Sequence, residues 1–308
     1  MEKGSNYLSS VILLCGSLLA SGIYMIFFHF YPAASLFFFY ITVVFAGLGL
    51  IKVFNEAAHR FSSPLNRVVY WIHSIIFETF AVIFTLFIKP FGKGNWAACG
   101  PKEGRPILLV HGYMQNASNW AYLKRALCQK GLGPIYTLNL KHPFRSIRDY
   151  ALMVAEKAET IRQETGRPDL SLIGHSMGGL VSAWYAAQIA LPGRVTDVIT
   201  IGSPIGGTRL AAIAIGPNGR EMELGSHFVK ALQQGMQQKT KTKFFHIAST
   251  TDQVIIPQSS AWRGFHPKQE YLVDDLGHMS LLFSPRIAEK IWEWAMHTHS
   301  ENGKRAGK

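Results

Sequence analysis

The chain has 308 residues, of which 48% are hydrophobic and 16% charged, and its formal net charge is +12. This composition is too apolar for a disordered chain, and the length allows one domain of about 200 residues plus an additional segment. The basic residues are dispersed and not gathered with aromatic residues on one element, which argues against a nucleic-acid-binding protein. A solvated basic surface, or attraction to anionic lipid headgroups, explains the charge better.

The N-terminal part of the chain is almost purely apolar. From Gly4 to Ile51 it contains no Asp, Glu, Lys or Arg. Two runs, Tyr7–Tyr31 and Ala33–Phe54, are each long enough to cross a hydrocarbon core of about 30 Å. A cleaved signal peptide would be followed by polar sequence, whereas here a second apolar run follows at once after Pro32. We therefore predict a transmembrane helical hairpin over residues 1–56.

Residues 57–104 are expected to form a hydrophobic membrane-associated helix and a linker. Val68–Ile88 is long enough to span a membrane, but it contains His73 and Glu78. A carboxylate at mid-membrane is costly unless it is paired. The segment is therefore either a third span or a helix that lies at the membrane interface against the domain that follows, and we favour the second interpretation.

The distribution of positive charge bears on the topology. Lys3, Lys52, Arg60 and Arg67 flank the hairpin, while its turn carries no charge. The positive-inside rule places both ends of such a hairpin in the cytoplasm. The catalytic domain would then face the cytoplasm if Val68–Ile88 does not cross the membrane and the outside if it does, and the sequence leaves both open.

From Arg105 onward, short apolar runs alternate with amphipathic segments, and residues 105–300 are predicted to form the catalytic domain, followed by a basic tail at 301–308. Alternation of strands and helices with short turns predicts a mostly parallel sheet with helices on both faces, an α/β fold. Strands are expected at Pro106–Val110, Ile135–Leu140, Leu170–Gly174, Val195–Ile201, Phe244–Ser249 and Tyr271–Val273, and helices at Asn119–Lys130, Ser146–Glu164, Met177–Ala190 and Pro285–His297.

The pentapeptide Gly174-His175-Ser176-Met177-Gly178 has the form G-x-S-x-G. It directly follows a predicted apolar strand and opens a predicted helix, which is the context of a nucleophile elbow. The glycines give room for the tight turn, and the helix dipole favours negative charge at Ser176. The sequence therefore predicts Ser176 as a nucleophile, against the alternative of a buried Gly-Ser turn without catalytic use.

A serine nucleophile needs a base and an acid that orients the base. In this fold they follow the serine in the order acid then histidine, after later strands. Asp252 and His278 each lie in a loop after a predicted strand. The rivals are less suitable, because His246 falls inside a strand, His266 precedes a proline, and Asp274 and Asp275 lie too near His278 in the chain. We predict Asp252 and His278.

The tetrahedral oxyanion of acyl transfer needs preorganised donors. The backbone N–H of Met177, the residue after the nucleophile, is expected to be one. The other is expected from the loop after the first strand, at Tyr113. His111 in the same loop is interpreted as a structural histidine.

Several motifs occur in one order: LLVHGYMQNASNW, SLIGHSMGGLVSAWY, TIGSPIGGTRLA, STTDQVIIP and GHMSLL. On these motifs the chain from about Glu78 onward resembles bacterial lipase/esterase-like α/β-hydrolases. The resemblance implies an ester hydrolase with the triad and oxyanion donors named above. Members with a similar apolar N-terminal module are membrane-tethered, which implies the bacterial inner (cytoplasmic) membrane, and a related branch resembles lipid-remodelling deacylases.

The sequence departs from this family at Ser203–Thr208 (SPIGGT), where many relatives have Thr-Pro-His-His-Gly-Thr. The difference leaves the triad intact but removes the basis for carrying over a substrate preference. Between Gly207 and Thr242 no strand pattern appears, and either a lid or a plain surface insertion with a polar helix near Phe228–Gln238 fits this segment.

The sequence therefore predicts a membrane-anchored serine ester hydrolase acting on a lipid or another acyl ester. An acyltransferase or amidase with the same triad, and a non-catalytic membrane-tethered scaffold, remain alternatives. No cofactor, metal or nucleic acid is expected, and the oligomeric state is left open. The three cysteines match no metal or redox spacing; a Cys99–Cys128 disulfide would be compatible with the sequence, although no pattern favours it.

Overall fold

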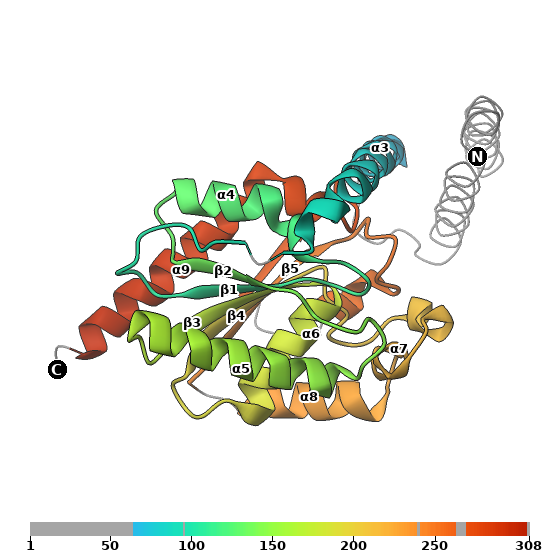
Figure 1. Ribbon diagram of the computed structural model, residues 1–308. Coiled ribbons are helices and arrows are strands. Elements are labelled where there is room, and N and C mark those ends of the chain that lie inside the picture. The colour runs from blue at the N-terminus through green and yellow to red at the C-terminus, as the bar shows by residue number, and fades with distance from the viewer. Residues whose placement is uncertain (1–63, 95, 239–240, 263–268, 307–308) are drawn as a thin grey trace. The chain divides into compact units, whose positions relative to one another are not determined.

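The structure is a computed structural model that describes residues 64–94, 96–238, 241–262 and 269–306 (Figure 1). The predicted transmembrane hairpin over residues 1–56 lies outside the described residues. The folded part combines one central sheet with helices on both of its faces.

The described residues form one six-stranded sheet of order β2-β1-β3-β4-β5-β6, and all neighbouring strands are parallel. The strands are apolar because both faces of a parallel sheet are covered. The predicted parallel α/β fold is thus confirmed. The strands are β1 (Ile107–Val110), β2 (Ile135–Leu138), β3 (Leu170–His175), β4 (Val195–Ile201), β5 (Lys243–Ser249) and β6 (Glu270–Val273).

The two faces of the sheet carry different sets of helices. One face is covered by α5 (Ile147–Thr165), α6 (Met177–Trp184) and α8 (His227–Gln238), and the other by α4 (Ala121–Gln129) and α9 (Pro285–Ala306) (Figure 1). Alternate residues of one strand serve the two cores, as the two-residue side-chain period of a strand requires. In β1, Leu108 and Val110 pack on the α5 side, and Ile107 and Leu109 pack on the α4 side.

Local signals determine several helix ends. The Ser146 hydroxyl accepts a hydrogen bond from the Asp149 N–H at 3.0 Å, which caps the start of α5, and Gly166 ends the helix at φ 68°. The last helix is longer than its predicted 285–297, because α9 continues to Ala306 and includes residues assigned to the basic tail.

The segment between β4 and β5 contains two distinct helices. The longer, α8, buries Phe228, Leu232 and Met236 against the core, so the polar helix expected near Phe228–Gln238 is a packed core element. The shorter, α7 (Pro217–Glu221), follows the 3-10 turn Arg209–Ile213.

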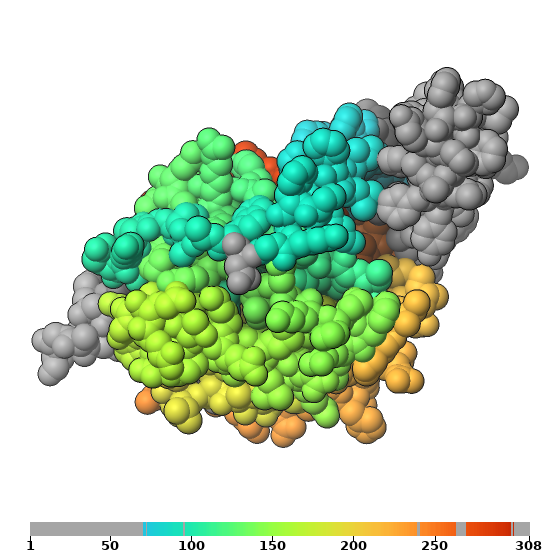
Figure 2. Space-filling model, viewed as in Figure 1, coloured from blue at the N-terminus to red at the C-terminus, as the bar shows by residue number. Residues whose placement is uncertain are grey.

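Helix α3 (Pro64–Ile88) precedes the sheet and ends in the 3-10 turn Lys89–Gly92. Within the described residues, length and composition alone would allow one helical stretch, His73–Gly92, to cross a membrane. The helix lies on the surface of the domain in Figure 2. It contacts the 3-10 turn Ser280–Phe283, which directly follows the His278 loop.

Two features join the linker after α3 to the sheet. Cys99 pairs with Ile135 of β2 through backbone hydrogen bonds, with Ile135 N–H to Cys99 O at 2.8 Å. A disulfide connects Cys99 to Cys128 of α4. The linker is therefore fixed against β2 and α4.

Candidate active site

Ser176 lies at the sharp turn between β3 and α6. Its backbone adopts φ 54° and ψ −128°, a conformation that is strained for a residue with a side chain and that is typical of functional sites. The Ser176 N–H donates to the Ile201 carbonyl at 2.9 Å, so the end of β4 holds the turn in place. The serine is therefore presented at the carboxyl edge of the sheet.

The turn requires glycine at the predicted positions 174 and 178, because other backbone atoms lie too close to leave room for a Cβ there. A Cβ at Gly174 would overlap the backbone of Gly178, and a Cβ at Gly178 would overlap the carbonyl oxygens of Val110 and His111. The start of α6 thus packs directly on the end of β1, as the G-x-S-x-G spacing predicts. His175, between the glycine and the serine, is fully buried.

Asp252 follows β5, His278 follows β6, and the two side chains are in contact. His278 Nδ1 lies 2.8 Å from Asp252 Oδ2, and both residues are buried. The other carboxylate oxygen, Oδ1, accepts from the N–H groups of Val254 (2.7 Å) and Ile255 (3.0 Å). The aspartate is thus fixed by its own loop, and one oxygen remains directed at the imidazole.

Ser176 and the Asp252–His278 pair meet at the same edge of the sheet. Ile201 accepts the Ser176 N–H, and a Cβ on the next residue, Gly202, would lie 3.3 Å from both Asp252 Oδ2 and His278 Nδ1. His175 Nε2 lies 3.2 Å from the His278 carbonyl oxygen, to which it can donate. Among the described residues the Ser176 hydroxyl makes no hydrogen bond to His278, which is common in active sites without substrate.

The loop after β1 lies against the serine. A Cβ at Gly112 would be 2.9 Å from the Ser176 Cβ, so Gly112 allows the loop to approach. Among the described residues, neither the Tyr113 N–H nor the Met177 N–H donates a hydrogen bond. The Tyr113 hydroxyl is bonded to the backbone of Ile215, at 3.0 Å to its carbonyl and 3.1 Å from its N–H. Met177 directly follows Ser176, and Tyr113 directly follows Gly112, so the two unbonded N–H groups belong to residues next to the serine and to the loop against it.

The histidines around the site differ in proton affinity. Burial lowers the pKa of His278, but the charge of Asp252, its hydrogen bond and the charge of Glu78 outweigh burial and raise that pKa above its usual value. Burial lowers the pKa of His175 well below normal and that of His111 to about 4. His111 Nε2 accepts the Leu140 N–H at 2.9 Å, so this neutral histidine supports the loop, as expected.

The rival acids and bases have other partners. The Asp275 carboxylate accepts two hydrogen bonds from Arg286, each 2.7 Å. His246 lies inside β5 and its Nδ1 is 2.8 Å from the Thr200 hydroxyl. His266 lies outside the described residues. Within the described part of the chain, no group of three or more His, Cys, Asp or Glu residues could hold a metal ion.

Two residues near the site were not predicted from sequence. Gln115 accepts the Gly112 N–H at 2.9 Å and so shapes the loop beside Ser176. Glu78 of α3 accepts backbone N–H groups of Met279 and Ser280, directly after His278. The sequence carried a signal for Glu78, because a lone carboxylate in an apolar helix requires partners. It carried none for Gln115.

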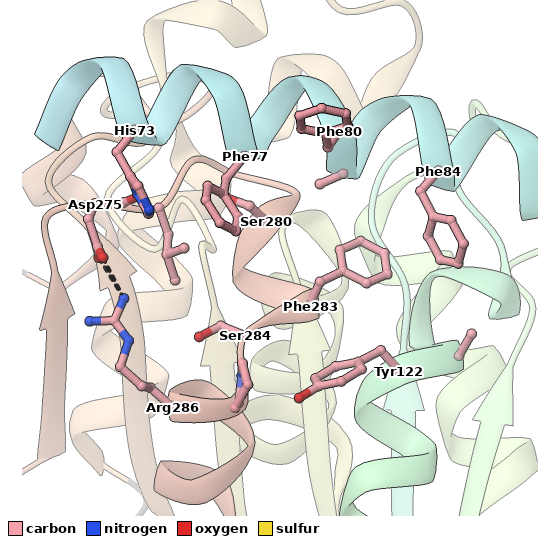
Figure 3. A pocket seen from close by; sticks show the side chains of 14 residues that line it. His73, Phe77, Phe80, Phe84, Tyr122, Asp275, Ser280, Phe283, Ser284 and Arg286 are labelled. Carbon is pink, nitrogen blue, oxygen red and sulfur yellow. Dashed lines mark hydrogen bonds and ion pairs between the residues drawn. The ribbon is translucent and has the colours of Figure 1, made fainter. Parts of the chain in front are cut away.

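A groove opens between α3 and the turn after His278 (Figure 3). Its volume is about 810 Å³, and it is mostly apolar, with Phe77, Phe84, Phe283 and Tyr122 among its walls. The Asp275–Arg286 ion pair closes one end. Of the described residues that line the groove, none belongs to the predicted triad.

Comparison with known proteins bears on the fold. Residues 105–218 match the alpha/beta hydrolase fold family. A stretch of 93 residues is 32% identical to the sn-1-specific diacylglycerol lipase ABHD11 of Xenopus laevis. That match covers 29% of this chain, and the chain spans 30% of the relative's length.

Solved structures extend the likeness of fold over more of the chain. Mature Bacillus licheniformis lipase BlEst2 superposes with a TM-score of 0.54 at 18% identity, covering 66% of this chain and 95% of that one. Paleococcus ferrophilus monoacylglycerol lipase gives 0.51 at 17% identity, covering 67% and 99%. With its parallel sheet and these matches, the described domain has the α/β-hydrolase fold.

Proposed function

We propose that this protein is a serine ester hydrolase, with Ser176 as nucleophile, His278 as base and Asp252 as the acid that orients it. The observation that carries the proposal is the strained turn at Ser176, beside two free backbone N–H groups and the buried Asp252–His278 pair. A structural serine would require neither the strain nor the unbonded donors.

The proposed reaction has two halves. The Ser176 hydroxyl attacks the ester carbonyl as His278 Nε2 takes its proton, and the imidazolium is stabilised by Asp252 at 2.8 Å. The N–H groups of Tyr113 and Met177 would bind the oxyanion. His278 then gives the proton to the leaving alcohol, which leaves an acyl group on Ser176. Water, deprotonated by His278, releases the acid and restores the serine.

A lipid ester as substrate is supported by the apolar surface near the site. Met114 of the loop after β1, Phe144 after β2, and Ile213 and Ile215 beside Tyr113 are all exposed. Exposed apolar residues grouped around a site are typical of contact with lipid or another apolar partner. Short soluble esters would not need this rim.

Membrane association of the whole chain is part of the proposal. The outward face of α3 and the turn after it expose large apolar side chains, with Phe87 74% and Phe91 71% exposed. A helix with aromatic residues on its free face is suited to the headgroup region of a bilayer. The apolar runs predicted as a hairpin precede this helix in the chain, separated from it by a short polar stretch. Together these features support α3 as an interfacial helix.

The test is hydrolysis of p-nitrophenyl esters of increasing acyl length by the full chain in detergent, beside Ser176→Ala. Loss of a serine nucleophile lowers turnover by up to about a million-fold. Ser259→Ala is the matched control, because Ser259 is a half-buried serine of the 3-10 turn Gln258–Ala261 and belongs to neither the elbow nor the triad.

Activity that survives in Ser176→Ala at the wild-type level would contradict the proposed nucleophile. A preference for medium or long acyl chains is expected, and equal rates at all lengths would contradict the lipid substrate. Covalent labelling of the wild type, but not of Ser176→Ala, by a fluorophosphonate probe is the accompanying readout.

A further inference from the structure

The inner face of α3 holds both catalytic loops. On the loop that carries His278, His73 donates through Nδ1 to the Asp275 carbonyl at 3.0 Å. On the loop that carries Asp252, the Ser74 hydroxyl donates to the Thr251 carbonyl at 3.4 Å and accepts from Gln253 Nε2 at 3.2 Å. These contacts join residues separated by 177 positions or more.

Glu78 makes the closest of these connections. Its Oε1 accepts the Met279 N–H at 2.8 Å, and its Oε2 accepts the N–H groups of Met279 and Ser280, each at 2.9 Å. The side chain is 1% exposed. A Cβ on Gly277 would lie 2.5 Å from Oε2, so the missing side chain at this position lets the carboxylate reach the loop.

All three of these contacts are N–H donors, which is the arrangement that a carboxylate prefers. Hydrogen bonds between a carboxylate and backbone N–H groups are stronger than neutral ones, and burial strengthens them further. They hold the two residues directly after His278. The position of the imidazole along its loop is therefore fixed from α3 as well as from Asp252.

We propose that Glu78 is a positioning residue for His278, so that α3 is a working part of the active site. The proposal rests on the proposed function, since it assigns a role relative to His278 as the base. It means that the surface helix which we propose to lie at the bilayer also controls the geometry of proton transfer. Helix α3 and the loop that carries His278 would then move together.

A purely structural role for Glu78 makes a different prediction. Loss of a buried carboxylate that only fastens α3 would lower the melting temperature and the yield, but each folded molecule would keep the wild-type kcat. A positioning role lowers kcat for every molecule that still binds substrate. Misplacement of a catalytic group by about 1 Å costs about a hundredfold in rate.

The experiment compares Glu78→Gln and Glu78→Asp with the wild-type full chain in detergent. Active enzyme is counted by fluorophosphonate labelling, and kcat, KM and the pH profile are measured on a soluble ester. Thr79→Ala is the matched control, because Thr79 is exposed on the same helix and its hydroxyl donates to the Ile75 carbonyl of α3 at 2.8 Å.

In Glu78→Gln we expect kcat per labelled site to fall about ten- to a hundredfold with KM within a factor of two. The acid limb of its pH profile should move to lower pH, because an ionised Glu78 favours the protonated imidazole. Burial raises the pKa of Glu78, while its bonds to the Met279 and Ser280 N–H groups oppose that rise, so the shift is expected only where Glu78 is ionised. Glu78→Asp keeps the charge but is one methylene shorter, so kcat should fall while the acid limb stays near the wild-type position. Thr79→Ala should match the wild type.

The proposal is overturned if both Glu78 variants keep the wild-type kcat per labelled site and the wild-type acid limb of the pH profile. This holds even if their melting temperatures fall. The proposed function fails separately, and visibly, if Ser176→Ala keeps its activity or its labelling. A dead Ser176→Ala beside fully active Glu78 variants would reject only the role of Glu78.

Discussion

The two oxygens of the Asp252 carboxylate have different partners, and the substitution Asp252→Asn distinguishes them. One oxygen accepts two backbone N–H groups and the other faces His278 Nδ1 at 2.8 Å. In Asp252→Asn the carbonyl oxygen can keep the backbone bonds, which places the amide NH₂ against the imidazole. An NH₂ group can pair there only with an unprotonated Nδ1, so Nε2 carries the proton and cannot act as base.

We therefore expect Asp252→Asn to fold normally and to lose about ten-thousandfold in kcat. Wild-type kcat/KM should rise with pH through a pKa above 6.5, because the base must be neutral and His278 has a raised pKa. The measurement is kcat/KM for a short soluble ester from pH 5 to 9, with melting temperature as the control for folding. A variant within tenfold of wild type would show that another group orients the base.

At the same scale, Glu78 marks the limit of prediction from sequence. A charge inside an apolar helix indicates that a partner exists, but it does not identify that partner. The backbone N–H groups of Met279 and Ser280 lie about two hundred positions away in the chain and have no sequence signature. Only the fold brings them together. Ser176, Asp252 and His278 were easier to predict as candidates because each follows a strand.

Among the elements, buried strands were predicted best, since β1 and β3 read as continuous apolar runs bounded by turns. Helix ends were less accurate. The helix predicted over Met177–Ala190 is α-helical only to Trp184 and continues as a π-turn over Tyr185–Ile189. Backbone hydrogen-bond registers of this kind depend on tertiary packing and not on local pattern.

Helix α3 supports a prediction on the proposed membrane surface. Phe87 and Phe91 are 74% and 71% exposed, so replacing both by serine removes little packing from the domain. Burying a Phe side chain in an apolar medium is worth about 1.5–3 kcal/mol. We expect the Phe87→Ser/Phe91→Ser variant to hydrolyse a vesicle-embedded ester at least tenfold more slowly, because about 1.4 kcal/mol is a factor of ten.

The same variant should keep the wild-type rate on a short soluble ester, because neither phenylalanine contacts the triad. Leu191→Ser is the matched control: Leu191 is 72% exposed and precedes β4, at the edge of the sheet opposite to Ser176. If Leu191→Ser and Phe87→Ser/Phe91→Ser lose the same share of their rate on vesicles, general surface apolarity, and not α3, determines the rate on lipid.

For the molecule as a whole, the order of the elements along the chain predicted little about which distant segments contact one another. The sheet order β2-β1-β3-β4-β5-β6 follows from parallel strands joined by crossover helices, which is a restricted set of topologies. The linker between α3 and β1, however, had no predicted partner. It is held by pairing of Cys99 with Ile135 and by the disulfide to Cys128.

That disulfide supports a prediction for global stability. It joins positions 29 apart and closes a loop that contains β1 and Tyr113. Constraining an unfolded loop of this size is worth about 3.5 kcal/mol in the chain-entropy account. For domains of 150–250 residues, 1 kcal/mol corresponds to roughly 2–4 °C in melting temperature, so reduction should lower it by about 10 °C.

The measurement is thermal unfolding of the purified full chain with and without reductant. Cys99→Ser should show the same loss without reductant and no further loss when reductant is added. Cys15→Ser is the control, since Cys15 lies in the first apolar run, and it should leave the effect of reductant unchanged. If neither reductant nor Cys99→Ser changes the melting temperature, noncovalent contacts, among them the pairing of Cys99 with Ile135 and the bond from Lys124 to the Ala97 carbonyl, hold the linker without the disulfide. The loop that carries Tyr113 would then not depend on the disulfide for its position beside Ser176.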